Sequence, residues 1–297
     1  GRQDLVNMAK YYEGLIKNFP KASPAALAEA HFLLGRAAFD QGDFQSSISH
    51  MSEAKTLDPQ KYGEQVNVLT VLSYHKLQDV NKLKEALETL QKENPAAVSR
   101  VPDVIPAWLG LQAYGMKDLE TADKYMTWAT QNDQLQNVKK VIWRNLAKVR
   151  LALKKYDRAL VASNNFLKVE DQPYRRADGM LDKASILLGL GKYADARKTA
   201  EEALALGVEG PLMASLKIVL GDISYAEKKF DEAAKHYGVT AELFVNDAEL
   251  KPKALFKAAE ALDKAGRKSE ASQYRARLQK EFPDWKQEGE SLPPDAR

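Results

Sequence analysis

Histidine is the side chain that most readily supplies metal ligands or moves protons near neutral pH, and this chain has four of them. They are His31, His50, His75 and His236. No two form an H-x3-H or HExxH pattern, and none has a carboxylate at the spacing of a metal-binding helix. Cysteine is absent, which excludes disulfides, thiolate zinc sites and cysteine nucleophiles. The sequence therefore predicts no metal site.

Other patterns that mark catalytic sites are also missing from the sequence. There is no GxSxG nucleophile elbow, no P-loop and no Rossmann glycine pattern. Adjacent carboxylates such as Glu201 and Glu202 point in different directions from one helix, which suits solvation rather than acid–base chemistry. We therefore predict no catalytic residues and no cofactor, and we expect the protein not to be an enzyme.

A polar cluster that could bind a polypeptide occurs in the middle of the chain. Arg144, Asn145 and Lys148 fall at i, i+1 and i+4, which puts them on one face of a helix. They could hold a partner's carboxylate or backbone carbonyl, and Arg144 could do so with two parallel hydrogen bonds. Alternatively, they pair within the chain with Asp178 and Asp182. The sequence leaves both possibilities open.

Charge and hydropathy narrow the class of partner. The chain has 44 basic and 41 acidic residues, so its net charge of +3 is small for 297 residues. Nucleic-acid binding usually needs a clustered basic excess, and we predict no nucleic-acid partner. No apolar run approaches the roughly 20 residues that cross a bilayer. The residues shown are therefore expected to contain no membrane span.

The histidines and the polar cluster described above lie in a helical hairpin that is repeated along the chain. Residues 28–59 show apolar residues at helical spacing, then Gly42 and Asp43 as a break, then a second helical pattern closed by Asp58 and Pro59. A small residue in the middle of the first helix, or in one case valine, recurs at Gly35, Val71, Gly110, Ala147, Ala184, Gly221 and Ala259. The steps between them are 36, 39, 37, 37, 37 and 38 residues. Such a period predicts an array of stacked helix pairs, because no single pair can bury its apolar face.

This pattern resembles the tetratricopeptide repeat over nearly the whole chain. The closest copy has Leu34-Gly35, Gly42-Asp43-Phe44, Ala54 and Asp58-Pro59 in place, and a later copy has Leu220-Gly221, Phe230, Ala233 and Tyr237. The resemblance implies an all-α fold, a right-handed superhelical solenoid of antiparallel helix pairs. About seven full repeats are expected, preceded by a half repeat.

Four segments are expected along this array. Residues 5–20 align with residues 268–283, which are expected to form a second helix, so residues 1–20 are interpreted as a half repeat. Residues 21–101 hold repeats 1 and 2, and residues 102–283 hold repeats 3 to 7. Residues 284–297 are predicted to be a polar tail. Since the chain opens with Gly1 rather than methionine, we expect a trimmed or mature form whose upstream sequence supplies the missing first helix.

The resemblance also implies a binding surface, because first helices line the concave face of such arrays. The side chains expected to face that groove are Phe32, Arg36, Phe39, Trp108, Tyr114, Arg144, Asn145, Lys148, Asp182, Asp222, Tyr225, Lys253 and Lys257. The groove is then aromatic in repeats 1 to 3 and charged in repeats 4 to 7. We expect a protein or peptide partner, with aromatic residues supplying affinity and charges setting orientation.

The expected function is a non-catalytic scaffold or adaptor that binds a partner polypeptide along this face. The alternative is a regulatory or substrate-docking segment of a larger enzyme or membrane-anchored assembly, and the solenoid could also self-associate. The repeat ends Asn18-Phe19-Pro20 and Glu281-Phe282-Pro283 resemble those of bacterial periplasmic tetratricopeptide proteins. That resemblance implies the periplasm or cell envelope, with the cytoplasm as the alternative.

Overall fold

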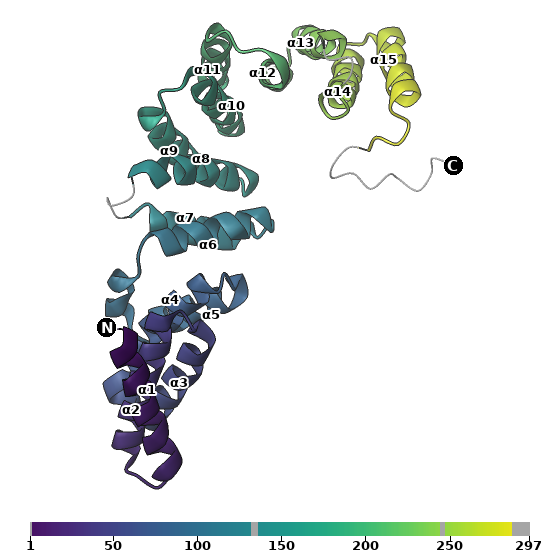
Figure 1. Cartoon of the computed structure of the whole chain (residues 1–297). Coiled ribbons are helices and arrows are strands. Elements are labelled where there is room, and N and C mark those ends of the chain that lie inside the picture. The colour runs from purple at the N-terminus through teal and green to yellow at the C-terminus, as the bar shows by residue number, and fades with distance from the viewer. Residues whose placement is uncertain (1, 132–135, 244–246, 287–297) are drawn as a thin grey trace. The chain divides into compact units, whose positions relative to one another are not determined.

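A computed structural model describes residues 2–131, 136–243 and 247–286, and every regular element in these ranges is helical. The chain divides into two compact units, residues 1–135 and 136–297. Helices that follow one another in the chain pack as antiparallel hairpins within each unit (Figure 1). The predicted all-α fold of consecutively paired helices is therefore confirmed.

The first unit holds three hairpins preceded by one helix. Its elements are α1 (Arg2–Asn18), α2 (Pro24–Gln41), α3 (Phe44–Leu57), α4 (Pro59–Lys76), α5 (Val80–Glu93), the 3₁₀ helix η1 (Pro95–Arg100), α6 (Val104–Gly115) and α7 (Leu119–Ala129). The pairs are α2 with α3, α4 with α5 and α6 with α7, and α1 packs on α2. We call α2, α4 and α6 first helices, and α1, α3, α5 and α7 second helices.

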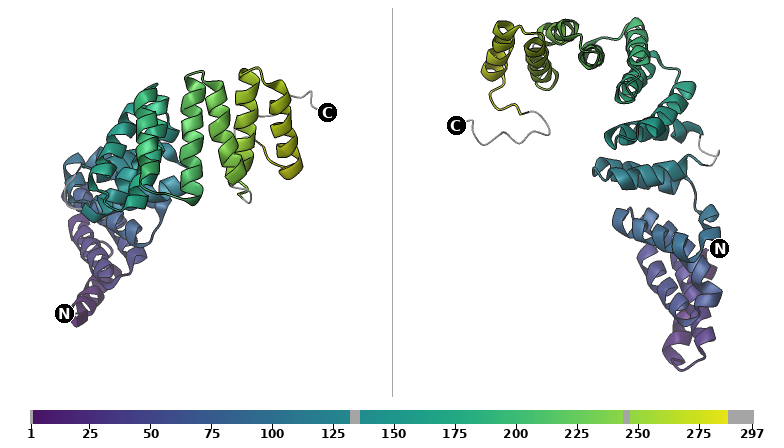
Figure 2. Two further views of the ribbon diagram at one scale, coloured as in Figure 1. Left: turned by 90° about the horizontal axis from the view of Figure 1, so that it is seen from above. Right: turned by 180° about the vertical axis from the view of Figure 1, so that it is seen from behind.

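The second unit holds four hairpins. Its helices are α8 (Gln136–Ala152), α9 (Tyr156–Val169), α10 (Pro173–Gly189), α11 (Tyr193–Ala205), α12 (Gly210–Ala226), α13 (Phe230–Leu243), α14 (Leu250–Lys264) and α15 (Lys268–Glu281). The even-numbered members are first helices and the odd-numbered members are second helices. Figure 2 shows α12 to α15, in green to yellow, standing side by side.

One backbone conformation turns every hairpin. The residue seven positions after the small residue has a positive φ in all seven repeats, between +57° and +85°. It is glycine at Gly42, Gly191 and Gly266, but it is Gln78, Lys117, Lys154 and Lys228 in the other four. A left-handed residue ends the first helix and reverses the chain direction. The turn is therefore a property of the repeat, whichever residue occupies it.

The residue after this turn caps the second helix, and it differs between the two units. In the first unit it is Asp43, Asp79 or Asp118, whose carboxylate accepts a hydrogen bond from a backbone N–H three residues on, at 2.9–3.2 Å. In the second unit Lys155 and Lys192 hold the position and make no such side-chain bond. Aspartate also suits the positive end of the helix dipole, so the caps of the first unit are the stronger ones.

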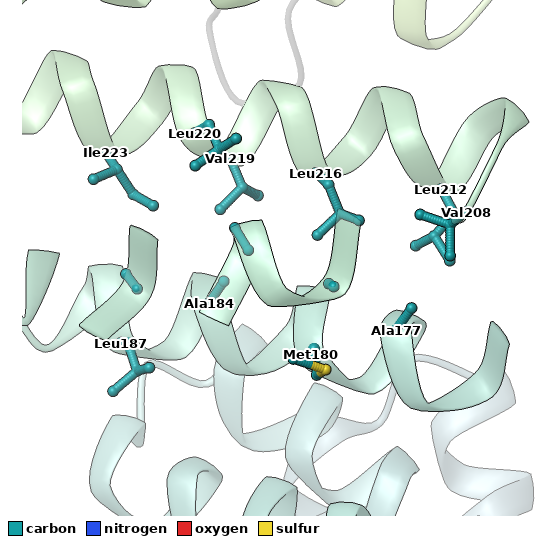
Figure 3. Close-up of a cluster of buried hydrophobic side chains, with 13 residues drawn as sticks. Ala177, Met180, Ala184, Leu187, Val208, Leu212, Leu216, Val219, Leu220 and Ile223 are labelled. Carbon is teal, nitrogen blue, oxygen red and sulfur yellow. The ribbon is translucent and has the colours of Figure 1, made fainter. Parts of the chain in front are cut away.

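Small residues let the paired helices approach closely. A Cβ atom added to Gly110 would lie 2.7 Å from Met126 Cγ and 2.9 Å from the Met126 backbone nitrogen, so the backbone of α7 lies directly against α6. The largest core cluster packs leucines of α12 against alanines of α10 and α11 (Figure 3). Interiors packed this tightly leave no room for an added methyl group.

The predicted segments compare with these helices as follows. Helix α1 lies within residues 1–20, whose assignment as a half repeat stays a prediction, and η1 lies between α5 and α6. The division expected between residues 101 and 102 stays a prediction. Residues 287–297 of the expected polar tail lie outside the described residues.

Candidate protein-binding surface

The first-helix face of the first unit contains a cavity of about 380 Å³. It is lined by Phe32, Arg36, Phe39 and Asp40 of α2, Gln65, Val68 and Leu69 of α4, and Arg100 of η1. Three residues that the sequence placed in the groove, Phe32, Arg36 and Phe39, are thus brought together. We call this the α2–α4 cavity.

Half of its lining residues are apolar, and one of its two arginines has no ion-pair partner among the described residues. Phe32 is only 8% exposed and stacks on Tyr62 with ring centroids 4.7 Å apart, so it forms a wall rather than a protruding contact. Arg100 Nη1 lies 2.5 Å from Glu64 Oε1. Arg36 is exposed, and within the described part of the chain no carboxylate lies at ion-pair distance from it. The cavity can therefore take an apolar side chain beside an acidic group.

Three predicted groove aromatics share one template position, four residues after the small residue. They are Phe39, Tyr114 and Tyr225. Phe39 meets Phe44 edge-on at 5.4 Å, and Tyr225 meets Phe230 edge-on at 5.2 Å, so each ring braces its own hairpin turn. Burial raises the pKa of Tyr225. These rings have a structural role in addition to any contact with a partner.

Trp108 of α6 lies beside the neighbouring first helix. Its ring meets His75 of α4 in a T-shaped arrangement with centroids 5.5 Å apart. The indole is half-buried, so part of it remains on the first-helix face. The contact with His75 fixes the Trp108 ring between α4 and α6.

The polar cluster of α8 is engaged within the chain. Arg144 Nη2 donates to Asp178 Oδ2 on α10, and Lys148 Nζ lies 4.0 Å from Asp182 Oδ2 on the same helix. Asn145 Nδ2 donates to the Val141 carbonyl at 2.9 Å. The internal pairing left open by the sequence is therefore the arrangement that the structure has.

Asp182 is the most perturbed carboxyl of this cluster. Burial raises its pKa to about 6, more than Lys148 and Arg144 lower it. Its Oδ2 atom and the Nε atom of Arg144 are both buried without a hydrogen-bond partner among the described residues. A carboxylate that is desolvated and only partly compensated is destabilised, which favours its protonated form.

A second ion pair joins the next two first helices. Lys257 Nζ of α14 and the Tyr237 hydroxyl of α13 both donate to Asp222 Oδ1 of α12, each at 2.6 Å. Burial and the neighbouring Asp222 carboxylate raise the pKa of Tyr237. Lys253 is exposed one turn before Lys257, and no described carboxylate pairs with it. Among the described residues, Lys253 therefore differs from Lys257, which is paired with Asp222.

Two polar clusters were not predicted from the sequence. His31 Nδ1 and His50 Nδ1 lie 3.0 Å apart across the α2–α3 hairpin, so one ring donates its proton to the other. Burial is the main cause that lowers the pKa of both rings. Nineteen residues separate them in the sequence, and only the register of the antiparallel helices could have indicated that they meet.

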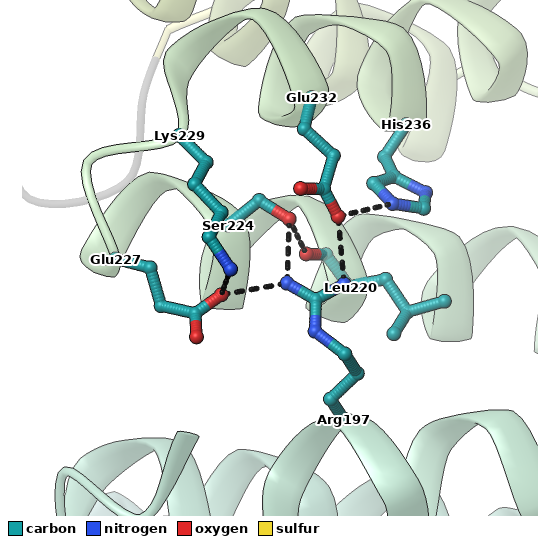
Figure 4. A network of polar contacts seen from close by, with 7 residues as sticks. All are labelled: Arg197, Leu220, Ser224, Glu227, Lys229, Glu232 and His236. Carbon is teal, nitrogen blue, oxygen red and sulfur yellow. Dashed lines mark hydrogen bonds and ion pairs between the residues drawn. The ribbon is translucent and has the colours of Figure 1, made fainter. Parts of the chain in front are cut away.

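The other unpredicted cluster is centred on Arg197 of α11 (Figure 4). Its guanidinium donates to Glu232 at 2.8 Å, to Glu227 at 2.7 Å and to Ser224 Oγ at 3.1 Å. These partners belong to α12, the turn that follows it and α13. Because one side chain joins three successive elements, we assign Arg197 a structural role in the repeat stack.

Two further findings concern the described residues as a set. In those ranges no group of three or more His, Cys, Asp or Glu side chains is arranged to hold a metal ion. Within the same ranges, no helix has both the length and the apolar character needed to span a bilayer.

The array of paired helices agrees with known families. Residues 28–61, 181–244 and 253–284 each match a tetratricopeptide repeat model. None of the curated proteins matches the chain. Three segments of the chain thus match tetratricopeptide repeats, and the expected tetratricopeptide-like array of helix pairs is confirmed.

Solved structures show the same fold at low sequence identity. The apo form of RapI superposes with a TM-score of 0.53 at 15% identity, covering 88% of this chain and 78% of that one. A Rap protein complexed with competence and sporulation factor gives 0.51 at 13% identity, covering 85% and 76%. At this identity the similarity concerns the fold alone.

Proposed function

We propose that this protein is a non-catalytic scaffold or adaptor that binds a partner polypeptide through its first-helix face. The observation that carries the proposal is the α2–α4 cavity. In it, apolar side chains lie beside Arg36, which has no ion-pair partner among the described residues. Tetratricopeptide repeats generally mediate protein–protein interaction, and an extended first-helix face suits a peptide better than a small substrate.

The chemistry of the cavity defines the partner that it would accept. Val68 and Leu69 offer aliphatic surface, and Phe32 and Phe39 offer aromatic surface. Arg36 offers a guanidinium that could bind a carboxylate through two hydrogen bonds. The partner segment is therefore expected to place an apolar side chain in the cavity and an Asp, a Glu or a chain-terminal carboxylate against Arg36.

Site-specific photocrosslinking tests this proposal. Gln65 is exposed and lines the cavity, so a benzoylphenylalanine at this position should crosslink a discrete polypeptide in cells. The same group at the exposed Lys92 of α5 is the control and should not capture that polypeptide. Arg36→Glu combined with the probe at position 65 should lose the crosslink. If positions 65 and 92 capture the same polypeptides regardless of Arg36, the cavity is not the binding surface.

Three finer assignments remain proposals that rest on the resemblance. An envelope location would be tested by fractionating cells that express the whole gene. Self-association of the array would appear as a concentration-dependent mass in light scattering. A role as the docking segment of a larger enzyme or membrane-anchored assembly would be tested by reading the complete open reading frame.

A further inference from the structure

A groove runs along α10 between the two second helices that flank it. It consists of two adjoining cavities of about 570 and 350 Å³, which share Asn164, Lys183, Thr199 and Glu202. The groove is therefore continuous over α9, α10 and α11. It is bounded by second helices, so it is separate from the first-helix face, and we call it the α9–α11 groove.

Cations dominate its lining. The basic residues are Lys168, Arg176, Lys183, Lys192 and Lys198, against two acidic residues, Asp195 and Glu202. Lys198 lies 3.9 Å from Glu202, and Arg176 Nη1 donates to the backbone carbonyls of Leu167 and Glu170. Neither Lys168 nor Lys183 has a carboxylate at ion-pair distance in the described parts of the chain. Their charges are available to an external anion.

The equivalent groove of the first unit shows that lysines without an ion-pair partner are not a general property of the repeat. That groove lies over α4 between α3 and α5 and measures about 270 Å³. Its lysines are satisfied within the chain: Lys55 donates to Glu93 at 2.7 Å and to Asn67 at 2.9 Å, and Lys82 donates to Glu85 at 2.9 Å. The same place in the fold is therefore neutralised in one unit and left cationic in the other.

The floor of the α9–α11 groove decides which anion fits. Leu160 and Leu167 are half-buried and contribute apolar surface between the lysines, and the buried side chains of Met180 and Leu187 lie at the base of the groove. Aliphatic side chains of a peptide can bury against such a floor, whereas a nucleic-acid backbone or a free phosphate gains nothing from it. Asp195 and Glu202 would also repel a uniformly anionic ligand.

We propose that the α9–α11 groove is a second docking surface, which binds an acidic polypeptide segment with interspersed aliphatic residues. Carboxylates of the segment would pair with Lys168 and Lys183, and its aliphatic side chains would contact Leu167 and Met180. Asn164 is half-buried and has an amide that can bond the backbone of the segment. This surface does not depend on the α2–α4 cavity, because every residue involved belongs to the second unit.

Fluorescence anisotropy with the full chain tests the proposal. The probe is a fluorescein-labelled 12-residue peptide of alternating aspartate and leucine, and a lysine–leucine peptide and a 12-nucleotide oligothymidylate are the comparisons. We expect the acidic peptide to bind at least tenfold more tightly than either comparison. We also expect the Lys168→Glu/Lys183→Glu variant to weaken that binding at least tenfold.

The matched control is Lys235→Glu/Lys264→Glu, which makes the same change in net charge at two exposed lysines elsewhere in the second unit. It should change the affinity less than twofold, and Arg36→Glu in the first unit should do the same. Equal weakening by both double variants would show that only net charge matters and would overturn the proposal. Tighter binding of oligothymidylate, or no binding of the acidic peptide, would overturn it as well.

Discussion

At the scale of single residues, the turn of each hairpin carries a conformational cost that differs among repeats. Gln78, Lys117, Lys154 and Lys228 hold positive φ angles of 57–62°. A non-glycine residue in this left-handed region costs about 1–2 kcal/mol, because its Cβ crowds the following carbonyl oxygen. In four of the seven repeats this strain therefore lowers the free energy of unfolding, whereas the other three have glycine at the same position.

Lys154→Gly should consequently stabilise the protein. Relief of the left-handed strain, about 1–2 kcal/mol, exceeds the extra unfolded-state entropy of glycine, about 0.5–1 kcal/mol. We expect the free energy of unfolding to rise by about 0.5 kcal/mol in urea titrations followed by circular dichroism. Ala152→Gly, two residues earlier at the last position of α8, is the control and should not raise it, because Ala152 has no positive φ to relieve. Destabilisation by Lys154→Gly would contradict the strain argument.

Asp182 makes the free energy of unfolding depend on pH in the direction opposite to that of most carboxyl groups, because its pKa is raised in the folded protein. Burial raises its folded-state pKa from the ordinary aspartate value of 3.8 to about 6, so the folded protein binds the proton more tightly than the unfolded chain does. Stability from this group is present below about pH 4 and is lost as the pH rises through 6. We expect the carboxyl ¹³C resonance of Asp182 to titrate near pH 6.

The stability that is lost when Asp182 ionises can also be measured by comparing the free energies of unfolding of wild type and a variant. Asp182→Asn removes the titrating group, so the unfolding free energy of the variant relative to wild type should increase between pH 4 and pH 7. The increase should be about 3 kcal/mol at most, from 1.36 kcal/mol per pKa unit. A ¹³C titration near pH 4, with no pH-dependent difference between variant and wild type, would refute the assignment.

Residue-scale features were predictable only where the residue type itself carries the signal. Gly42 and Asp43 indicated a turn from their types alone, and the structure has the turn there. Lys154 and Gln78 adopt the same conformation, but lysine and glutamine are not typical of it, so only the repeat register points to them. The His31–His50 contact was missed because a pair 19 residues apart matches no metal-binding spacing within one helix.

At the scale of helices, ion pairs join neighbouring first helices of the second unit. Arg144 and Lys148 of α8 pair with Asp178 and Asp182 of α10, and Asp222 of α12 pairs with Lys257 of α14. The members of each pair lie 34 or 35 residues apart, which is three residues fewer than the step of 37 or 38 residues between the small residues of the same two repeats. The assignment of these side chains to a partner-binding face stays a prediction. The sequence could not decide between an internal partner and an external one, because either can neutralise the same charge.

Reversing the charges of α8 should therefore destabilise the array. Arg144→Glu with Lys148→Glu would put four acidic groups between α8 and α10, and the four positions are all less than a third exposed. We expect a loss of about 1–3 kcal/mol in the free energy of unfolding, between the values for exposed and buried pairs.

The compensating change separates this effect from a general loss of packing. Asp178→Lys with Asp182→Lys, added to the reversed α8, restores opposite charges and should recover at least half of the lost free energy. If the quadruple variant is no more stable than the double variant, the ion pairs do not hold α8 against α10.

At the scale of the whole molecule, the two units share one repeat but differ in their helix caps and in where their charged side chains are paired. The first unit has aspartate caps, internally paired lysines in its second-helix groove and an uncommitted arginine on its first-helix face. The second unit pairs Arg144, Lys148 and Lys257 internally, and in the α9–α11 groove Lys168 and Lys183 have no carboxylate at ion-pair distance among the described residues. The regular period predicted the helices, whereas these differences depend on which neighbours each side chain meets.

Calorimetric titration of the polypeptide captured at position 65 tests the central claim, that the α2–α4 cavity binds a partner. Arg36→Glu should weaken its binding at least tenfold, which is about 1.4 kcal/mol or more. Lys92→Glu, an equal change of charge at an exposed site in the same unit, should alter it less than twofold. Equal affinity for wild type and Arg36→Glu would contradict the account.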